Sequence, residues 1–105
     1  MCIRDSSTGT YNTASGFLAL YSNTTGNFNT ASGASALYFN TASYNTAFGH
    51  AALMENLNGT ENTASGESAL ANNTSGNDNT AAGAYALYEN SDGNSLLSKT
   101  GLIPA

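Results

Sequence analysis

A nine-residue motif, Asn-Thr-Ala-x-Gly-x-x-Ala-Leu, recurs five times and constrains the fold of this 105-residue chain more than any other feature. Successive copies begin 17 residues apart, except for one interval of 16. A strict period of this length predicts a repeat architecture, in which each copy forms one unit that stacks on the next. The copies are Asn12–Leu20, Asn29–Leu37, Asn45–Leu53, Asn62–Leu70 and Asn79–Leu87.

The irregular interval separates packed residues from loop residues. The spacing from Asn to Leu never changes within a copy, whereas the segment from Leu to the next Asn is one residue shorter between Leu37 and Asn45. A one-residue change in a packed strand would turn every later side chain to the wrong face, but a surface loop tolerates it. We therefore predict that Asn-to-Leu is packed and that the next segment holds a turn. The short segment is also the one without the turn glycine found at Gly26, Gly59, Gly76 and Gly93.

The start of each copy predicts a short β-strand of about four residues, for example Tyr11–Ala14. Alternation along such a strand places Asn and Ala on one face and Thr on the other. Ala is the small apolar residue present in every copy, so we expect it to point inward and Thr to form an outward ladder. The inward Ala column is Ala14, Ala31, Ala47, Ala64 and Ala81, and the outward Thr ladder is Thr13, Thr30, Thr46, Thr63 and Thr80.

The second half of the motif, Gly-x-x-Ala-Leu followed by x-x-Asn, has two readings. Its fixed positions form one stripe of a helix, and the final Asn suits a left-handed terminating position, which favours one to two helical turns in some coils. The alternative is a second strand with a bend at Ala-Leu. In either case we expect the leucines to form the main apolar column of the core, at Leu20, Leu37, Leu53, Leu70 and Leu87.

These features predict a repeat solenoid that is mainly β. We expect a parallel β-roll or β-helix of about five 17-residue coils, with one short helical turn per coil as an option. The solenoid should span residues 8–95. We expect residues 1–7 to be a leader without native structure, and residues 96–105 to be a C-terminal cap or a frayed tail.

Charge and composition exclude several functions. The net charge is −5, and the basic residues Arg4 and Lys99 both lie outside the repeats. No basic face exists to neutralise phosphates, so we expect neither nucleic-acid binding nor a polybasic membrane patch. No apolar run approaches the ~20 residues that span a bilayer, so we expect no membrane insertion by this segment. Cys2 is the single cysteine, which rules out an internal disulfide.

Catalytic chemistry also lacks candidates. His50 is the single histidine and occupies a position that varies between copies, while the acidic residues occur without a paired base. The glycines belong to the repeat and form no phosphate-binding loop. We therefore expect no enzyme activity, no catalytic residues, no metal site and no cofactor.

Two outward columns are candidates for interaction. The position before each Asn carries aromatic residues in the first three copies, Tyr11, Phe28 and Tyr44, which suggests a subunit contact or a platform for sugars. Simple stacking between neighbouring coils is the alternative explanation. The Thr ladder offers regularly spaced hydroxyls that could order water or bind ice, although Thr is also a favourable residue in exposed strands.

The motif Asn-Thr-Ala-x-Gly-x-x-Ala-Leu, closed by Asn-Thr-Thr-Gly, resembles the head repeats of trimeric autotransporter adhesins and related repeats in phage-type tail fibres. The resemblance covers roughly residues 8–95, with a longer repeat than the family's usual one and with Ala in the strand. It implies a left-handed parallel β-roll outside the cell that assembles as a trimer and attaches to host-surface glycans or matrix proteins. From it we expect an extracellular structural or adhesive module, on the cell surface or a virion tail, as a fragment of a larger protein. An ice- or surface-water-binding solenoid is the alternative.

Overall fold

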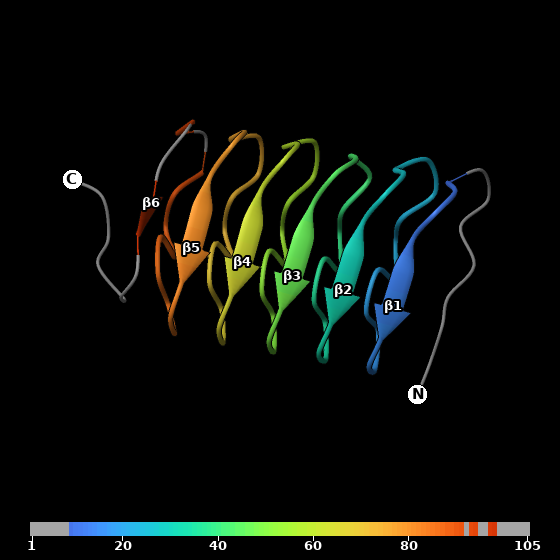
Figure 1. The fold of residues 1–105 in the computed structure, drawn as a ribbon, viewed down its shortest axis with the longest axis horizontal. Helices are drawn as coiled ribbons and strands as arrows, with labels where there is room; N and C mark the ends of the chain where they lie inside the picture. The colour runs from blue at the N-terminus through green and yellow to red at the C-terminus, as the bar shows by residue number, and fades with distance from the viewer. Residues whose placement is uncertain (1–8, 92, 95–96, 99–105) are drawn as a thin grey trace.

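The five copies of the motif open successive coils of a parallel β-solenoid. The computed structural model describes residues 9–91, 93–94 and 97–98. Its single sheet contains strands in sequence order, all parallel, so that each strand pairs with the same strand of the next coil (Figure 1). The strands are β1 (Thr13–Ser15), β2 (Thr30–Ser32), β3 (Thr46–Phe48), β4 (Thr63–Ser65), β5 (Thr80–Ala82) and β6 (Leu97–Ser98). The predicted β-solenoid of 17-residue coils is confirmed.

The expected end regions lie mostly outside this description. The leader proposed at residues 1–7 is not among the described residues, and neither is most of the cap or tail proposed at 96–105. Within that tail, the backbone of Leu97 and Ser98 forms β6, which pairs with β5 through Thr80 and Ala81.

Each of the strands β1–β5 is three residues long, one fewer than expected. The residue before each motif Asn has a positive φ between 59° and 64°, which is the left-handed region and cannot continue a strand. Extended backbone therefore begins only after the Asn. The residues with this conformation are Tyr11, Phe28, Tyr44, Glu61 and Asp78.

The expected helical turn is absent: no helix occurs among the described residues, and two consecutive β-turns replace it. In the first coil, the Ala19 N–H donates to the Gly16 carbonyl and the Asn23 N–H to the Leu20 carbonyl, both at 3.3 Å. Leu18 and Leu20 have φ values of 63° and 53°, and the same two positions are left-handed in every copy. The reason lies between coils: the Leu20 N–H donates to Ala36 of the next coil at 2.9 Å, so it cannot bond within a helix.

Glycine at the first turn is required by conformation and by space. Gly49 has a φ of 127°, and a Cβ added there would lie 2.7 Å from the carbonyl atoms of Gly66 in the next coil. Side chains at this position would force neighbouring coils apart. The motif Gly is therefore a condition for stacking coils at the spacing of a β-sheet.

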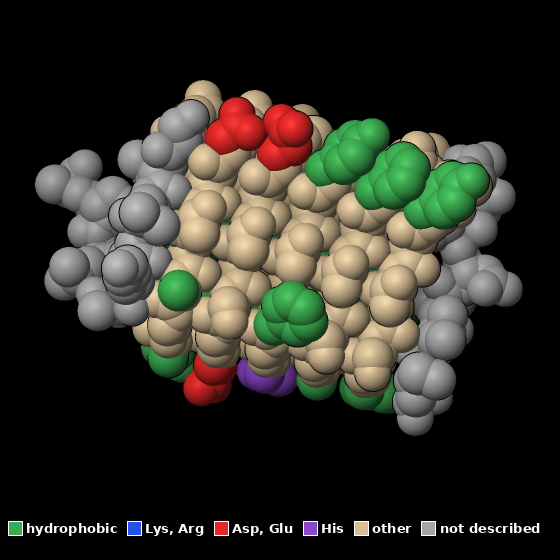
Figure 2. All heavy atoms as spheres, in the orientation of Figure 1, with side chains coloured by type: hydrophobic (Ala, Val, Ile, Leu, Met, Phe, Trp, Pro, Cys, Tyr) green, Lys and Arg blue, Asp and Glu red, His purple; other side chains and the backbone are tan. Residues whose placement is uncertain are grey.

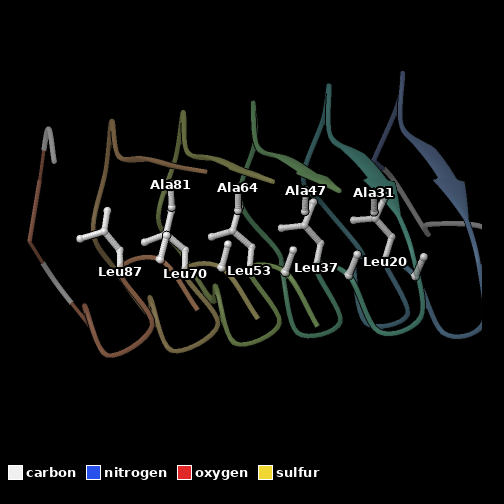
Figure 3. Close-up of a cluster of buried hydrophobic side chains, with 14 of the residues drawn as sticks. Leu20, Ala31, Leu37, Ala47, Leu53, Ala64, Leu70, Ala81 and Leu87 are labelled. Atoms are coloured by element: carbon white, nitrogen blue, oxygen red, sulfur yellow. The ribbon is translucent and has the colours of Figure 1, made fainter. Parts of the chain in front are cut away.

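The outward side chains of the strands are mostly Thr and Ser. Most of this face carries neither hydrophobic nor charged side chains (Figure 2). The central residue of each of the strands β1–β5, the motif Ala, points inward and is buried in every coil. On the opposite side of the interior, the five motif leucines form a column that faces the Ala column (Figure 3). The five leucines are between 0% and 4% exposed, so the core consists of one Leu per coil surrounded by Ala.

The short coil is adjusted in its second turn. The Ala42 carbonyl accepts hydrogen bonds from Asn29 and Asn40, as the Gly26 carbonyl does from Asn12 and Asn23 in the coil before. Ala42 is therefore the structural equivalent of Gly26. The missing residue falls between Asn40 and Ala42, where Thr41 alone replaces the Thr24-Thr25 pair.

Candidate interaction surfaces

Two ladders of asparagine fix the geometry from which the outward columns project. The first consists of the motif asparagines, which are buried except for the half-buried Asn12. Each Oδ1 accepts the backbone N–H of the next Asn in the ladder, for example from Asn29 to Asn12 at 2.8 Å and from Asn45 to Asn29 at 2.9 Å. Each Nδ2 donates to the second-turn carbonyl of its own coil, for example from Asn45 to Gly59 at 2.8 Å.

The second ladder was missed by the sequence analysis, which assigned these residues a left-handed terminating role. The left-handed φ belongs instead to the Leu three residues earlier. The Nδ2 group of Asn56 donates to Oδ1 of Asn40 at 2.6 Å, and that of Asn73 donates to Asn56 at 2.8 Å. The hydrogen-bonded ladder is Asn40, Asn56, Asn73 and Asn90, and Asn23 occupies the equivalent position of the first coil; all five side chains are buried. The available signal was the constant spacing of three residues from Leu to this Asn, which persists in the short coil.

The aromatic column at one edge of the strand face is a continuous stack. Tyr11 and Phe28 have ring centroids 4.9 Å apart with planes 4° apart, and Phe28 and Tyr44 follow at 5.1 Å and 10°. The three rings are 77%, 47% and 57% exposed. Because neighbouring rings cover each other's faces, the column offers mainly ring edges and two hydroxyl groups to a partner. A flat platform for sugar rings would need exposed ring faces.

The same column becomes acidic in the fourth and fifth coils. Figure 2 shows a run of hydrophobic side chains that gives way to acidic side chains along this edge. The acidic residues are Glu61 and Asp78, both exposed, and their backbones have the same left-handed φ as the aromatic residues. One column thus has an uncharged aromatic half and a negatively charged half.

The Thr ladder lies in register over β1–β5. Thr13 pairs with Thr30, and the pattern continues through Thr46, Thr63 and Thr80. A second outward column runs beside it, and consists of Ser15, Ser32, Phe48, Ser65 and Ala82. Adjacent strands lie about 4.8 Å apart and alternate residues of one strand about 6.7 Å apart, so the hydroxyls form a regular array that Phe48 and Ala82 interrupt.

Further aromatic residues that the sequence analysis did not single out lie on the turns after the strands. Phe17 and Tyr85 occupy the first turn and are exposed, while Tyr21 stacks on Tyr38 with centroids 5.2 Å apart. The Tyr38 ring also meets Phe39 edge-on at 4.5 Å. Tyr21 and Tyr38 occupy equivalent positions of the first two coils, whereas Phe17, Phe39 and Tyr85 lie in other columns, so these rings form scattered contacts and not one continuous stack.

Within the part of the chain that the structure describes, little supports a catalytic or metal-binding site. His50 is exposed in the column that also contains Phe17 and Glu67. Among the described residues, no group of three or more His, Cys, Asp or Glu side chains could hold a metal ion. No helix within them is long and apolar enough to cross a membrane.

Comparison with protein-family models, curated proteins and solved structures finds no match to this chain.

Proposed function

We propose that this chain is a structural and adhesive module of a larger extracellular protein, either a cell-surface adhesin or a tail fibre. The observation that carries the proposal is the exposed stack of Tyr11, Phe28 and Tyr44. Large apolar side chains gathered in one exposed patch mark interaction surfaces. The repeat's resemblance to adhesin heads supports the same function, with host-surface glycans or matrix proteins as targets.

The stack is preorganised for contact. The backbone N–H groups of Phe28 and Tyr44 donate to the preceding coil, from Phe28 to Thr10 at 3.1 Å and from Tyr44 to Asn27 at 3.0 Å. The left-handed backbone and the ring stacking together restrict the side chains before any partner arrives. Little conformational entropy remains to be lost on binding, which favours affinity from a small contact.

The first partner that we propose is a second copy of this chain. The resemblance to trimeric adhesin heads suggests that the assembly is a trimer. The uncharged half of the column offers a surface without electrostatic repulsion, whereas Glu61 and Asp78 of two copies would repel each other in a parallel arrangement. Contact should therefore be strongest over the first three coils. The tyrosine hydroxyls at both ends of the stack supply hydrogen-bonding groups for a polar partner, such as a glycan.

The test is a double variant, Phe28→Ser with Tyr44→Ser, compared with Phe48→Ser as a matched control. Phe28 and Phe48 are each 47% exposed but lie on different columns. We expect the double variant to lose binding to glycan- or matrix-coated surfaces and to shift any oligomer toward monomer in light scattering. The control should retain both properties. Equal behaviour of the double variant and the control would refute the contact role of the stack.

A second candidate function, binding of ice or ordered surface water, is favoured by the in-register Thr and Ser columns. The ring of Phe48 is the largest interruption of this hydroxyl array. Replacing it through Phe48→Thr should therefore increase thermal hysteresis if the face binds ice, and Thr63→Leu should abolish it. A wild-type protein and a Phe48→Thr variant that both lack thermal hysteresis would eliminate this alternative.

A further inference from the structure

Asn58 differs from every other asparagine of this chain in the residue that follows it. The chain contains 15 asparagines, and Asn58 is the one that precedes glycine. It lies in the second turn of the third coil, outside both ladders, and its side chain is exposed. Most ladder asparagines are followed by Thr, whose β-branched side chain crowds the amide nitrogen next to the Asn.

We propose that Asn58 is a site of spontaneous deamidation in the folded protein. The backbone nitrogen of Gly59 attacks Cγ of Asn58, a new C–N bond forms, and the Cγ–Nδ2 bond breaks. Nδ2 leaves as ammonia and takes the proton lost by the Gly59 nitrogen, which leaves a five-membered succinimide. Water then opens the ring: cleavage at Cγ gives aspartate, and cleavage at the backbone carbonyl carbon gives isoaspartate. Solvent water is the one co-reactant that the step needs.

The local structure leaves the reacting groups available. Among the residues that the structure describes, neither the Asn58 side-chain amide nor the Gly59 N–H has a hydrogen-bond partner. The turn is held by other groups: the Asn58 N–H donates to Thr74 at 3.0 Å, and the Gly59 carbonyl accepts from Asn45 and Asn56, each at 2.8 Å. Gly59 is buried, but it has no side chain of its own that would crowd its nitrogen against the Asn58 side chain.

Burial and hydrogen bonding protect the ladder asparagines from deamidation. Asn62 illustrates this: its Nδ2 donates to Gly76 at 2.8 Å, its Oδ1 accepts from Asn79 at 3.0 Å, and the side chain is buried. Rotation of this amide toward the following nitrogen would break both bonds. A protein that builds its interior from asparagine thus keeps the side chain of its one asparagine before glycine, Asn58, exposed at the surface.

The reaction should change charge without unfolding the coil. One neutral amide becomes a carboxylate, so the net charge of −5 becomes −6. Isoaspartate also adds one atom to the main chain, but it does so in the loop whose length already differs between coils. The ladder residues Asn56 and Asn62 lie on either side of this loop and are not altered.

The test is peptide mapping by mass spectrometry after incubation of the folded chain in heavy-oxygen water at mildly alkaline pH. We expect Asn58 to convert faster than every other asparagine, with heavy oxygen incorporated and with both aspartate and isoaspartate formed. Asn58→Gln should show no conversion at that position, because Gln would have to form a less favourable six-membered ring. Circular dichroism should remain unchanged as Asn58 is consumed.

A matched variant, Ser75→Asn, places the same Asn-Gly pair in the equivalent exposed turn of the next coil, before Gly76. It should create a second site of similar rate. The proposal is overturned if Asn58 of the folded chain converts no faster than the half-buried Asn72, or converts only in denaturant. Loss of β-structure in step with conversion would overturn the inference that the turn tolerates the change.

Discussion

Each buried asparagine side chain completes hydrogen bonds that the backbone of its coil cannot make alone. Asn62 shows the pattern: its Oδ1 accepts from the backbone of Asn79, and its Nδ2 donates to the carbonyl of Gly76. Turns occupy most of each coil, so many backbone groups lie outside the sheet and still need partners. An asparagine that offers one acceptor and two donors can serve two coils at once.

The first prediction concerns this residue. Asn62→Ala removes the acceptor for the buried Asn79 N–H, and each buried group left unpaired costs about 1–3 kcal/mol. The free energy of unfolding, measured with denaturant, should fall by at least that amount. Asn72→Ala is the control, since Asn72 lies outside the ladders and is half-buried. Comparable losses in the two variants would show that the ladder contributes no more than any asparagine.

Left-handed backbone at non-glycine residues is the second feature at the residue scale. Glu61, with φ of 60°, is exposed and extends the aromatic column, so its side chain is not required for packing. An L-residue in this region costs roughly 1–2 kcal/mol, whereas glycine adopts it without that cost. The inter-coil hydrogen bonds that hold the neighbouring Asn62 offset this cost in the folded chain.

The second prediction follows from this strain. Glu61→Gly should leave the free energy of unfolding unchanged or raise it by less than about 1 kcal/mol. The strain relieved in the folded chain should match or slightly exceed the stability lost because glycine gives the unfolded chain more conformational freedom. Glu61→Val should destabilise, since a β-branched residue is least suited to this region. At the neighbouring strand residue Thr63 the order should invert, with Val tolerated and Gly costing about 0.5–1 kcal/mol. Thermal denaturation of the four variants tests this inversion, and the same order at both positions would contradict it.

At the scale of one coil, the chain alternates three-residue strands with two kinds of turn. The first turn, from Gly49 through Leu53 in the third coil, is fixed in length because its backbone bonds to both neighbouring coils. The second turn, after Asn56, connects the two ladders and varies by one residue between coils. Length variation is therefore confined to a loop that contributes no column to the core.

The third prediction uses this difference. A Gly inserted between Asn40 and Thr41 restores the 17-residue period at the position where the coil lacks a residue, and the variant should keep its β-structure and most of its stability. A Gly inserted between Ala47 and Phe48 shifts every later side chain of that coil and should disrupt stacking. Circular dichroism with denaturant titration distinguishes them. If both variants unfold at the same denaturant concentration, the division into fixed and variable segments is wrong.

The period predicted the architecture because a repeat of this length with one small apolar set can bury its residues only by stacking. The inward Ala column and the outward Thr ladder lie where alternation placed them, and the motif leucines, which were expected in the core with either conformation of the second half of the motif, are buried. The conformation of the turn that begins at the motif Gly could not be predicted from the sequence in the same way. Its Ala-Leu spacing fits a helix stripe, and the competing factor, the hydrogen bond from Leu37 to Ala52 of the next coil, is not local in sequence. The burial of Asn40 was missed because asparagine is ordinarily a surface and turn residue.

The whole molecule is a short rod, with principal extents of 37 × 22 × 15 Å, whose stability must come from repeated interfaces. Each coil contributes one buried Leu, a few Ala and two ladder asparagines, which is too little to fold alone. Stability should therefore approximate a sum of coil terms and nearest-neighbour interface terms. Coils at the two ends have one interface each, and interior coils have two.

The last prediction tests this additivity by adding a coil. Duplicating Asn62–Asp78 in tandem preserves the period and adds a complete set of ladder residues, including a second copy of Leu70 and of Asn73. Because the denaturant slope is proportional to the surface exposed on unfolding, it should rise by about one fifth when five coils become six, and the free energy of unfolding should rise with it. The control carries the same insert with its ladder asparagines and its leucine replaced by Ser, which lengthens the chain without extending the columns. That control should unfold at a lower denaturant concentration than the duplicated chain. If the two inserts behave alike, or if the complete coil lowers stability, the interfaces between coils are not what holds the solenoid together.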